Sequence, residues 1–396
     1  MRANALVFGY AALGLIALVM PTGFNHHRWL VVHLFLLGSV TNCIVTWTEH
    51  FTVTLLRVPQ PSRRQSAWRL LVLNLAVILS LIGISIDNGA LTVVGAGSLL
   101  IVMIAHSYNL YRLSKRALQS RFAGTVHYYL AGAACLLIGI VVGALSAFQS
   151  DGSVLRDSLH AGHIHANLLG WISVTVIGTF FTFWPTILRT KMVEGVMSAA
   201  RRALPYLFGG VVVTAIALAI NARFFAILGM IFYAIGLTLA SVPFIRTWRQ
   251  KAPHDLATFA IASSASWLSL GVLADIAALA LIAKLSDYVA WLDRFIPAFL
   301  IGFVGQLLLG ALTFLVPVIL GGGPAAVRKH ISRLSVAWRV RLLIFNLGAL
   351  LALFEGRVRE LGYALLVLSL GVFIGLVVST VRVGTRGADN FGNILS

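Results

Sequence analysis

The sequence has few charged side chains and very few acidic ones. Only 11% of its 396 residues are Asp, Glu, Lys or Arg, and only 12 of them are acidic, whereas a soluble domain is typically about a quarter charged. The hydrophobic share of 59% and the mean hydropathy of +0.93 are correspondingly high. These values exclude an ordinary water-soluble domain and predict that lipid is the main solvent.

Cysteine is also scarce. The chain has two, Cys43 and Cys135, and both fall inside apolar runs. Neither a disulfide framework nor a cysteine-rich zinc motif is therefore available. Both residues are expected to be small core residues.

Long apolar runs recur along the whole chain. A run of about twenty residues can cross ~30 Å of hydrocarbon as a helix that satisfies its own backbone hydrogen bonds. The first run lacks a small-residue cleavage site and is interpreted as a retained span. The prediction is an all-α polytopic membrane protein of about twelve transmembrane helices, at approximately 4–21, 29–56, 67–87, 90–112, 126–148, 160–187, 202–222, 224–248, 256–283, 291–320, 337–355 and 359–382.

The cations alternate from loop to loop. A net charge of +18 would suggest a nucleic-acid partner in a soluble protein, but 23 of the 30 Lys and Arg residues fall in every second loop and at the termini. This distribution follows the positive-inside rule. It predicts both termini in the cytoplasm, a multi-pass protein of the inner membrane, the lipid bilayer as partner and no nucleic acid.

A segment of the second predicted span recurs in the chain. Residues 33–57 align without gaps on 165–189, with eight of 25 positions identical and an offset of 165 − 33 = 132. A second step of 132 reaches 297–321, which keeps two leucines, two glycines and Pro317 but has Pro297 in place of the histidine. The period predicts repeats of about 1–125, 126–257 and 258–396. Each repeat would be a four-helix unit, and the three units would be related by a pseudo-threefold axis.

The segment HIHANLLGWISVTVIGTFFTFWP (163–185) and three four-helix units give the chain a family resemblance. It resembles subunit I of the haem-copper oxidase and nitric oxide reductase superfamily, and also the NnrS family of twelve-span proteins. The resemblance implies haem b, with copper as a further cofactor, and a quinol or redox-protein partner. The chain departs from the oxidases because span 10 has Gln306 and no histidine, and span 7 has none. A complete oxidase binuclear centre is therefore not expected.

The histidines fall at two depths. His33, His163 and His165 begin spans 2 and 6 near the outer face, and are the predicted cofactor and metal ligands of an outer centre. His50, His106 and His127 lie about 10 Å inside the cytoplasmic boundary and are the predicted ligands of an inner centre. Because His33 and His50 are ~25 Å apart along one helix, the centres are separate.

Each histidine also has a simpler interpretation. A membrane histidine can just hydrogen-bond to a carbonyl or hydroxyl group on a neighbouring helix. This interpretation weighs most for His106 and His127. His254 and His330, in basic loops, are expected to be solvated.

Other polar groups inside the predicted spans have two possible roles each. Asp275 and Glu49 are the candidates for a proton path, although Glu49 could instead reach towards Arg57. Trp171 and Trp184 could pack against a macrocycle or belong to the interfacial aromatic belt. Hydrogen bonds between helices are the expected role of Asn42, Asn167, Gln306 and Asn346.

Two functions remain open from the sequence. The first is a haem- and copper-binding membrane protein of the oxidase subunit I type, in electron transfer or nitrogen-oxide and oxygen chemistry, with an oxidoreductase activity undecided. The alternative is a transporter or channel with a histidine-lined proton or metal path. Against the alternative, the repeats of transporters are usually twofold.

Overall fold

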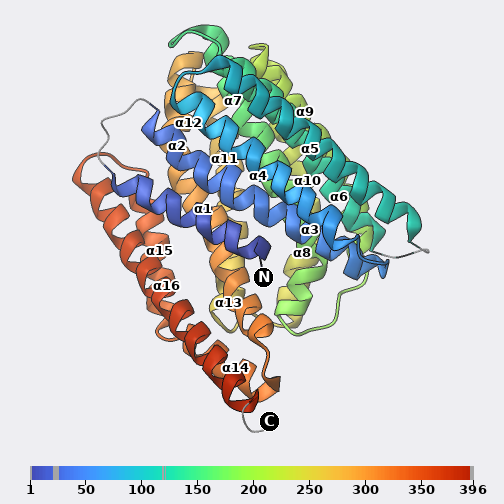
Figure 1. Ribbon diagram of the computed structural model, residues 1–396. Helices are drawn as coiled ribbons and strands as arrows, with labels where there is room; N and C mark the ends of the chain where they lie inside the picture. Colours follow the sequence, from blue (N-terminus) through green and yellow to red (C-terminus); the bar gives the residue numbers. More distant parts are fainter. Residues whose placement is uncertain (1, 21–25, 118–119, 121, 393–396) are drawn as a thin grey trace. The chain divides into compact units, whose positions relative to one another are not determined.

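The computed structural model describes residues 2–20, 26–117, 120 and 122–392, and these residues are almost entirely helical (Figure 1). No strand occurs among them. The all-α fold class predicted from the apolar runs is therefore confirmed.

Each of the twelve predicted spans coincides with a helix. Among the described residues, ten helices are long and apolar enough to cross a membrane. They are α2–η1–α3 (His27–Leu56), α4 (Arg63–Ser85), α5 (Gly89–Arg116), α6 (Ala123–Ala147), α7–η2–α8 (Val154–Ile187), α9 (Val196–Ala219), α10 (Arg223–Gln250), α11 (Leu256–Leu281), α12–η3–α13 (Leu285–Leu320) and the Arg357–Arg382 part of α16 (Arg357–Gly392).

The remaining two predicted spans are shorter helices. Helix α1 (Arg2–Val19) contains the apolar stretch Ala5–Leu18. Helix α15 (Trp338–Leu351) follows α14 (Gly323–Leu334), and the two are bent by 47°. The sequence predicts a basic loop over α14, because this segment is short and polar and lacks a long apolar run.

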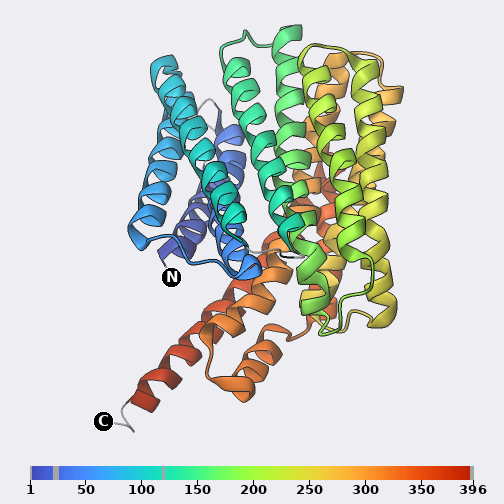
Figure 2. The same cartoon turned by 90° about the vertical axis from the view of Figure 1, so that its right-hand side faces the viewer.

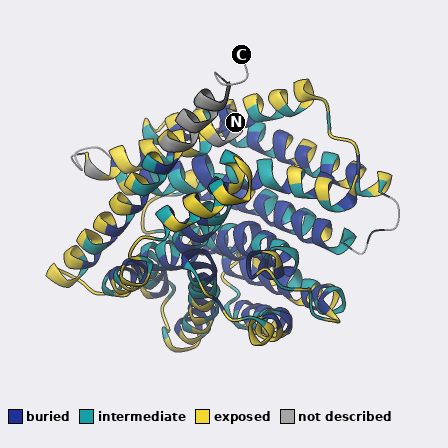
Figure 3. Cartoon of the chain, turned by 90° about the horizontal axis from the view of Figure 1, so that it is seen from below, coloured by how far each residue is buried: buried dark blue, intermediate teal, exposed yellow. Residues whose placement is uncertain are grey.

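The outward faces of the helices are apolar. Ile101, Leu273 and Val367 expose 69%, 59% and 61% of their surface. Exposed and buried residues alternate along the helices (Figure 3). Because contiguous apolar surface of this extent is not stable in water, this pattern supports a multi-pass membrane protein.

Contacts divide the chain into two compact units. Unit 1 contains residues 1–182, 194–243 and 284–286, and unit 2 contains 183–193, 244–283 and 287–396. Within unit 1, α4 runs alongside α5 and α6 lies beside α7 (Figures 1 and 2). Within unit 2, α11 packs on α13 and α15 on α16. The first two predicted repeats fall mainly in unit 1 and the third mainly in unit 2.

Three π-helical segments occur in corresponding places. They are η1 (Leu34–Val40), η2 (Ala166–Val174) and η3 (Leu300–Gly305), one in the second span of each predicted repeat. The first two begin 166 − 34 = 132 residues apart, which is the repeat period. Since π-helices are rare and often mark functional sites, their recurrence supports the triplication, which stays a prediction.

A hydroxyl hydrogen bond at the C-terminal end of the first two π-helical segments repeats with the same period. Thr41 Oγ1 donates to the Leu36 carbonyl at 3.0 Å, and Ser173 Oγ donates to the Leu168 carbonyl at 2.8 Å. Both bonds reach back five residues. A π-helix changes which carbonyl each amide reaches, and these hydroxyls supply an additional donor there.

Candidate functional site

The outer histidines lie directly before the π-helical segments of unit 1. His33 is the last residue of α2, and His163 and His165 are in the last turn of α7. His33 and His163 are half-buried, and His165 is 2% exposed. All three predicted outer ligands therefore lie at the corresponding end of their spans.

His33 and His165 hold the same hydrogen bond. Nδ1 of His33 lies 2.8 Å from the carbonyl oxygen of Trp29, and Nδ1 of His165 lies 2.8 Å from that of Ala161. The two carbonyls are themselves 161 − 29 = 132 residues apart. Since a carbonyl only accepts, Nδ1 carries the proton, and the lone pair of each neutral ring is on Nε2.

His163 packs against α6. Its Nδ1 lies 2.8 Å from the carbonyl oxygen of Gly139 and 3.3 Å from the Nδ2 atom of Asn167. A Cβ on Gly143 would come within 2.3 Å of His163 Nδ1, and one on Gly139 within 2.5 Å of the Asn167 amide. These two glycines therefore make the space that the imidazole and the amide occupy.

The His33 ring has two neighbouring rings. The Trp29 ring stacks on it with a centroid distance of 4.1 Å, and the His163 ring centroid is 6.0 Å away at an interplanar angle of 27°. The structure thus brings a side chain of span 2 and a side chain of span 6 together. The sequence predicts His33, His163 and His165 together as ligands of one outer centre, but which of these rings meet depends on the packing of α7.

The inner histidines do not gather in the same way. His106 is 1% exposed, with Nε2 at 3.1 Å from Thr48 Oγ1 and no hydrogen-bond partner at Nδ1. His50 is exposed beside Trp47, and His127 is exposed on α6. Among the residues that the structure describes, no group of three or more His, Cys, Asp or Glu is arranged to hold a metal ion.

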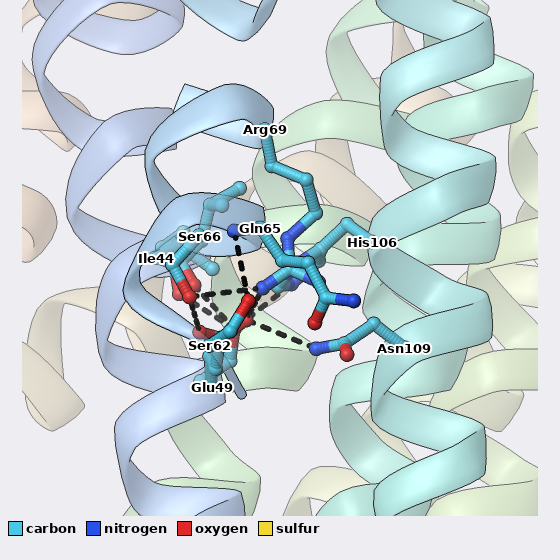
Figure 4. A network of polar contacts seen from close by, with 10 residues as sticks. Ile44, Glu49, Ser62, Gln65, Ser66, Arg69, His106 and Asn109 are labelled. Atoms are coloured by element: carbon cyan, nitrogen blue, oxygen red, sulfur yellow. Dashed lines mark hydrogen bonds and ion pairs between the residues drawn. The ribbon is translucent and has the colours of Figure 1, made fainter. Parts of the chain in front are cut away.

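Glu49 is the centre of a polar network that joins three helices (Figure 4). Its carboxylate pairs with Arg69 and accepts hydrogen bonds from Ser66 Oγ at 2.7 Å and Asn109 Nδ2 at 2.9 Å. The Arg69 and Glu49 side chains are each 16% exposed. The partner is Arg69, inside α4, and Arg57 is exposed. Sequence reasoning missed Arg69 because it was counted with the loop cations.

Asp275 lies in unit 2. It is 6% exposed, and Tyr288 Oη donates to its carboxylate at 2.7 Å. The Tyr288 ring begins a series of neighbouring aromatic rings along one face of α12 and η3, formed by Tyr288, Trp291, Phe295, Phe299 and Phe303. The buried position that motivated the proton-path prediction is present, with a tyrosine hydroxyl beside it.

The predicted amide contacts are largely as expected. Asn42 and Asn74 exchange hydrogen bonds of 2.9 and 3.2 Å between α3 and α4. Gln306 and Asn346 do so at 2.8 and 3.3 Å between α13 and α15. Asn167 differs, because its hydrogen bonds are to His163 of its own span.

The two tryptophans of the span 6 motif are buried. Trp171 is 2% exposed, and its Nε1 donates to Thr41 Oγ1 at 3.3 Å, which links spans 2 and 6. Trp184 is 4% exposed and donates to the Phe244 carbonyl at 3.2 Å.

The expectation for the two loop histidines holds for one of them. His254 is exposed, whereas His330 is 7% exposed. The prediction of a solvated His330 is wrong, because α14 is a helix that packs on α13 and α16 and buries this side chain.

Comparison of the chain with protein-family models and with curated proteins gives no match. The site is therefore interpreted from its own geometry.

Proposed function

We propose that this chain is a haem-binding integral membrane protein of the oxidase subunit I type, which acts in electron transfer or in nitrogen-oxide and oxygen chemistry without a complete binuclear centre. The observation that carries the proposal is the outer histidine cluster. Two repeat-equivalent imidazoles there, His33 and His165, each donate a hydrogen bond to the carbonyl four residues earlier, and the ring of a third, His163, lies 6.0 Å from that of His33.

The donor set fits a haem by its chemistry. An Nδ1–H bond to a backbone carbonyl is the usual second partner of a metal-ligating histidine, because it fixes the tautomer and leaves Nε2 to bind. His33 has such a bond, and the Nδ1 of His163 lies at the same distance from the Gly139 carbonyl.

The ring centroids of His33 and His163 are 6.0 Å apart at an interplanar angle of 27°. His33 from span 2 and His163 from span 6 would therefore be the residues that hold a haem between the two spans.

The number of available ligands favours haem over copper. Haem iron takes one or two protein ligands, because the macrocycle supplies the rest, whereas copper sites commonly use three protein ligands. The described residues bring no three such side chains into one metal group. Copper bound by His33, His163 and His165 is the competing outcome of the metal analysis below.

When bound, a haem b would supply reversible one-electron transfer or a site for a small oxidant. The protein's part is to hold His33 with Trp29 stacked on it, and to seat His163 in the space left by Gly143. Glu49, with His106 nearby on α5, would take up protons from the predicted cytoplasmic side (Figure 4), and Asp275 is the corresponding candidate in unit 2. The donor would be a quinol or a redox protein, and both termini would face the cytoplasm.

Metal analysis and spectroscopy of the purified protein test the proposal. We expect iron in the preparation and a sharp haem b band in the reduced-minus-oxidised spectrum. If the preparation contains copper and no haem, the cofactor bound at the same histidines is copper. A colourless, metal-free protein would contradict the proposal and favour a transporter or channel.

A further inference from the structure

Arg341 occupies an unusual position at the bend between α14 and α15 in unit 2. It lies in the first turn of α15 and is only 7% exposed. Its Nη1 donates to the carbonyl oxygens of Leu334 at 2.9 Å and Val336 at 3.0 Å, so it satisfies the end of α14. The guanidinium carbon lies 5.8 Å from the centroid of the Phe373 ring on α16.

The other edge of this guanidinium is unused. Nε and Nη2 are both buried and have no hydrogen-bond partner. These two donors form the side-on fork that matches two oxygens of a carboxylate or phosphate. The hydroxyl of Ser335, at the C-cap of α14 in the same bend, is also buried without a partner. Since arginine stays charged in proteins, this is a buried cation without a counter-ion.

The neighbouring sequence supplies cations and no anion. No Asp or Glu occurs between Asp293 and Glu355, and Glu355 pairs with Arg294. The same stretch contains Arg328, Lys329, Arg333 and Arg339 in addition to Arg341. Of these four, Arg328, Lys329 and Arg339 are exposed. The missing counter-charge of Arg341 therefore has to come from outside this segment.

We propose that the bend between α14 and α15 is a binding site for a phosphate group, independent of the proposed haem function. The Nε and Nη2 atoms of Arg341 bind two phosphate oxygens, Ser335 donates to a third, and the exposed cations of α14 attract the anion. Because the fork is covered by its surroundings, the covering segment has to move aside when the phosphate enters.

The surroundings point to a lipid as one source of the phosphate. Val336, Val340 and Leu343 expose 56%, 58% and 69% of their surface next to the bend. A basic segment beside an apolar helix face is the arrangement that binds the headgroup of an anionic phospholipid. Free inorganic phosphate offers the same oxyanion, so the experiment has to separate the two.

The test is a titration of the detergent-purified full chain with phosphatidylglycerol, phosphatidylcholine and inorganic phosphate in separate arms. Bound adducts are counted by native mass spectrometry, and the thermal unfolding midpoint is followed in parallel. We expect Arg341→Met to weaken binding about tenfold, and Arg341→Lys to weaken it about threefold, because lysine keeps the charge without the fork. The matched control is Arg339→Gln, which removes an exposed cation and should change binding less than twofold.

Each outcome decides the proposal. Saturable binding of phosphatidylglycerol that depends on Arg341 identifies a lipid headgroup, whereas Arg341-dependent binding of inorganic phosphate identifies a free anion. Equal affinities of the wild type and Arg341→Met in every arm would overturn the site. If Arg341→Met does not fold, Ser335→Ala serves in its place, and unchanged binding by that variant would overturn the site equally.

Discussion

The His163 ring occupies space that is open because Gly143 on α6 has no Cβ atom. We expect Gly143→Ala to weaken haem retention roughly tenfold, because the new Cβ would lie 2.3 Å from Nδ1 and displace the ring. Haem content per chain after purification measures the effect. Gly124→Ala is the matched control on the same helix, since a Cβ there meets nothing within 4 Å. Equal haem loss in both variants would mean that the position of His163 is irrelevant to binding.

The Glu49–Arg69 pair gives a prediction about stability. Both side chains are 16% exposed, so Glu49→Gln leaves a mostly buried cation unpaired and should lower the free energy of unfolding by about 3 kcal/mol. Adding Arg69→Met should recover part of the loss. The control pair is Arg294–Glu355, with side chains 55% and 68% exposed, where Glu355→Gln should cost less than about 1 kcal/mol. Denaturant titration in detergent compares them, and equal losses would contradict the account.

At the scale of elements, the Ser173 hydroxyl inside the π-helical segment η2 gives the next prediction. Ser173 is fully buried and donates to the Leu168 carbonyl. Ser173→Ala should therefore lower the free energy of unfolding by about 1 kcal/mol. Ser266→Ala removes a similar bond from an exposed serine and should have little effect. Thermal unfolding of both variants distinguishes a stabilising bond in the π-helical segment from an incidental one.

The sequence predicts where the long apolar helices lie, but it predicts neither the short helix α14 nor the π-helical segments. Runs of apolar residues predict spans because only a helix satisfies its backbone in lipid. Helix α14 was missed because GPAAVRKHISRL is short and basic, and its pattern also suits a loop. The π-helical segments have no equally clear sequence pattern, because their wider i→i+5 turns depend on how the helix packs against its neighbours. The nearest signal was the pair of hydroxyls, Thr41 and Ser173, at equivalent positions.

At the scale of the whole molecule, sequence spacing does not predict which side chains become partners. Positions along one helix place His33 and His163 near one end of their spans, but which rings meet depends on how the helices are rotated and packed. Glu49 illustrates the same limit: its partner Arg69 comes from another helix, twenty residues along the chain. His50 and His106 were predicted to belong to one inner centre, and His50 is exposed whereas His106 is buried.

The alternation of cations predicts the orientation of the chain. Because 23 of the 30 cations fall in every second loop and at the termini, a C-terminal green fluorescent protein fusion should be fluorescent, and a C-terminal alkaline phosphatase fusion should be inactive. The two fusions control for each other, because each reports on the opposite compartment. An active phosphatase fusion with a dark fluorescent-protein fusion would reverse the predicted topology.

The most direct test of the central claim is the haem content per chain of His33→Ala and His163→Ala beside the wild type. His254→Ala, which changes an exposed histidine in unit 2, controls for the substitution itself. The account predicts at least a tenfold loss of haem in the two cluster variants and wild-type haem in the control. Full haem content in both His33→Ala and His163→Ala would contradict it.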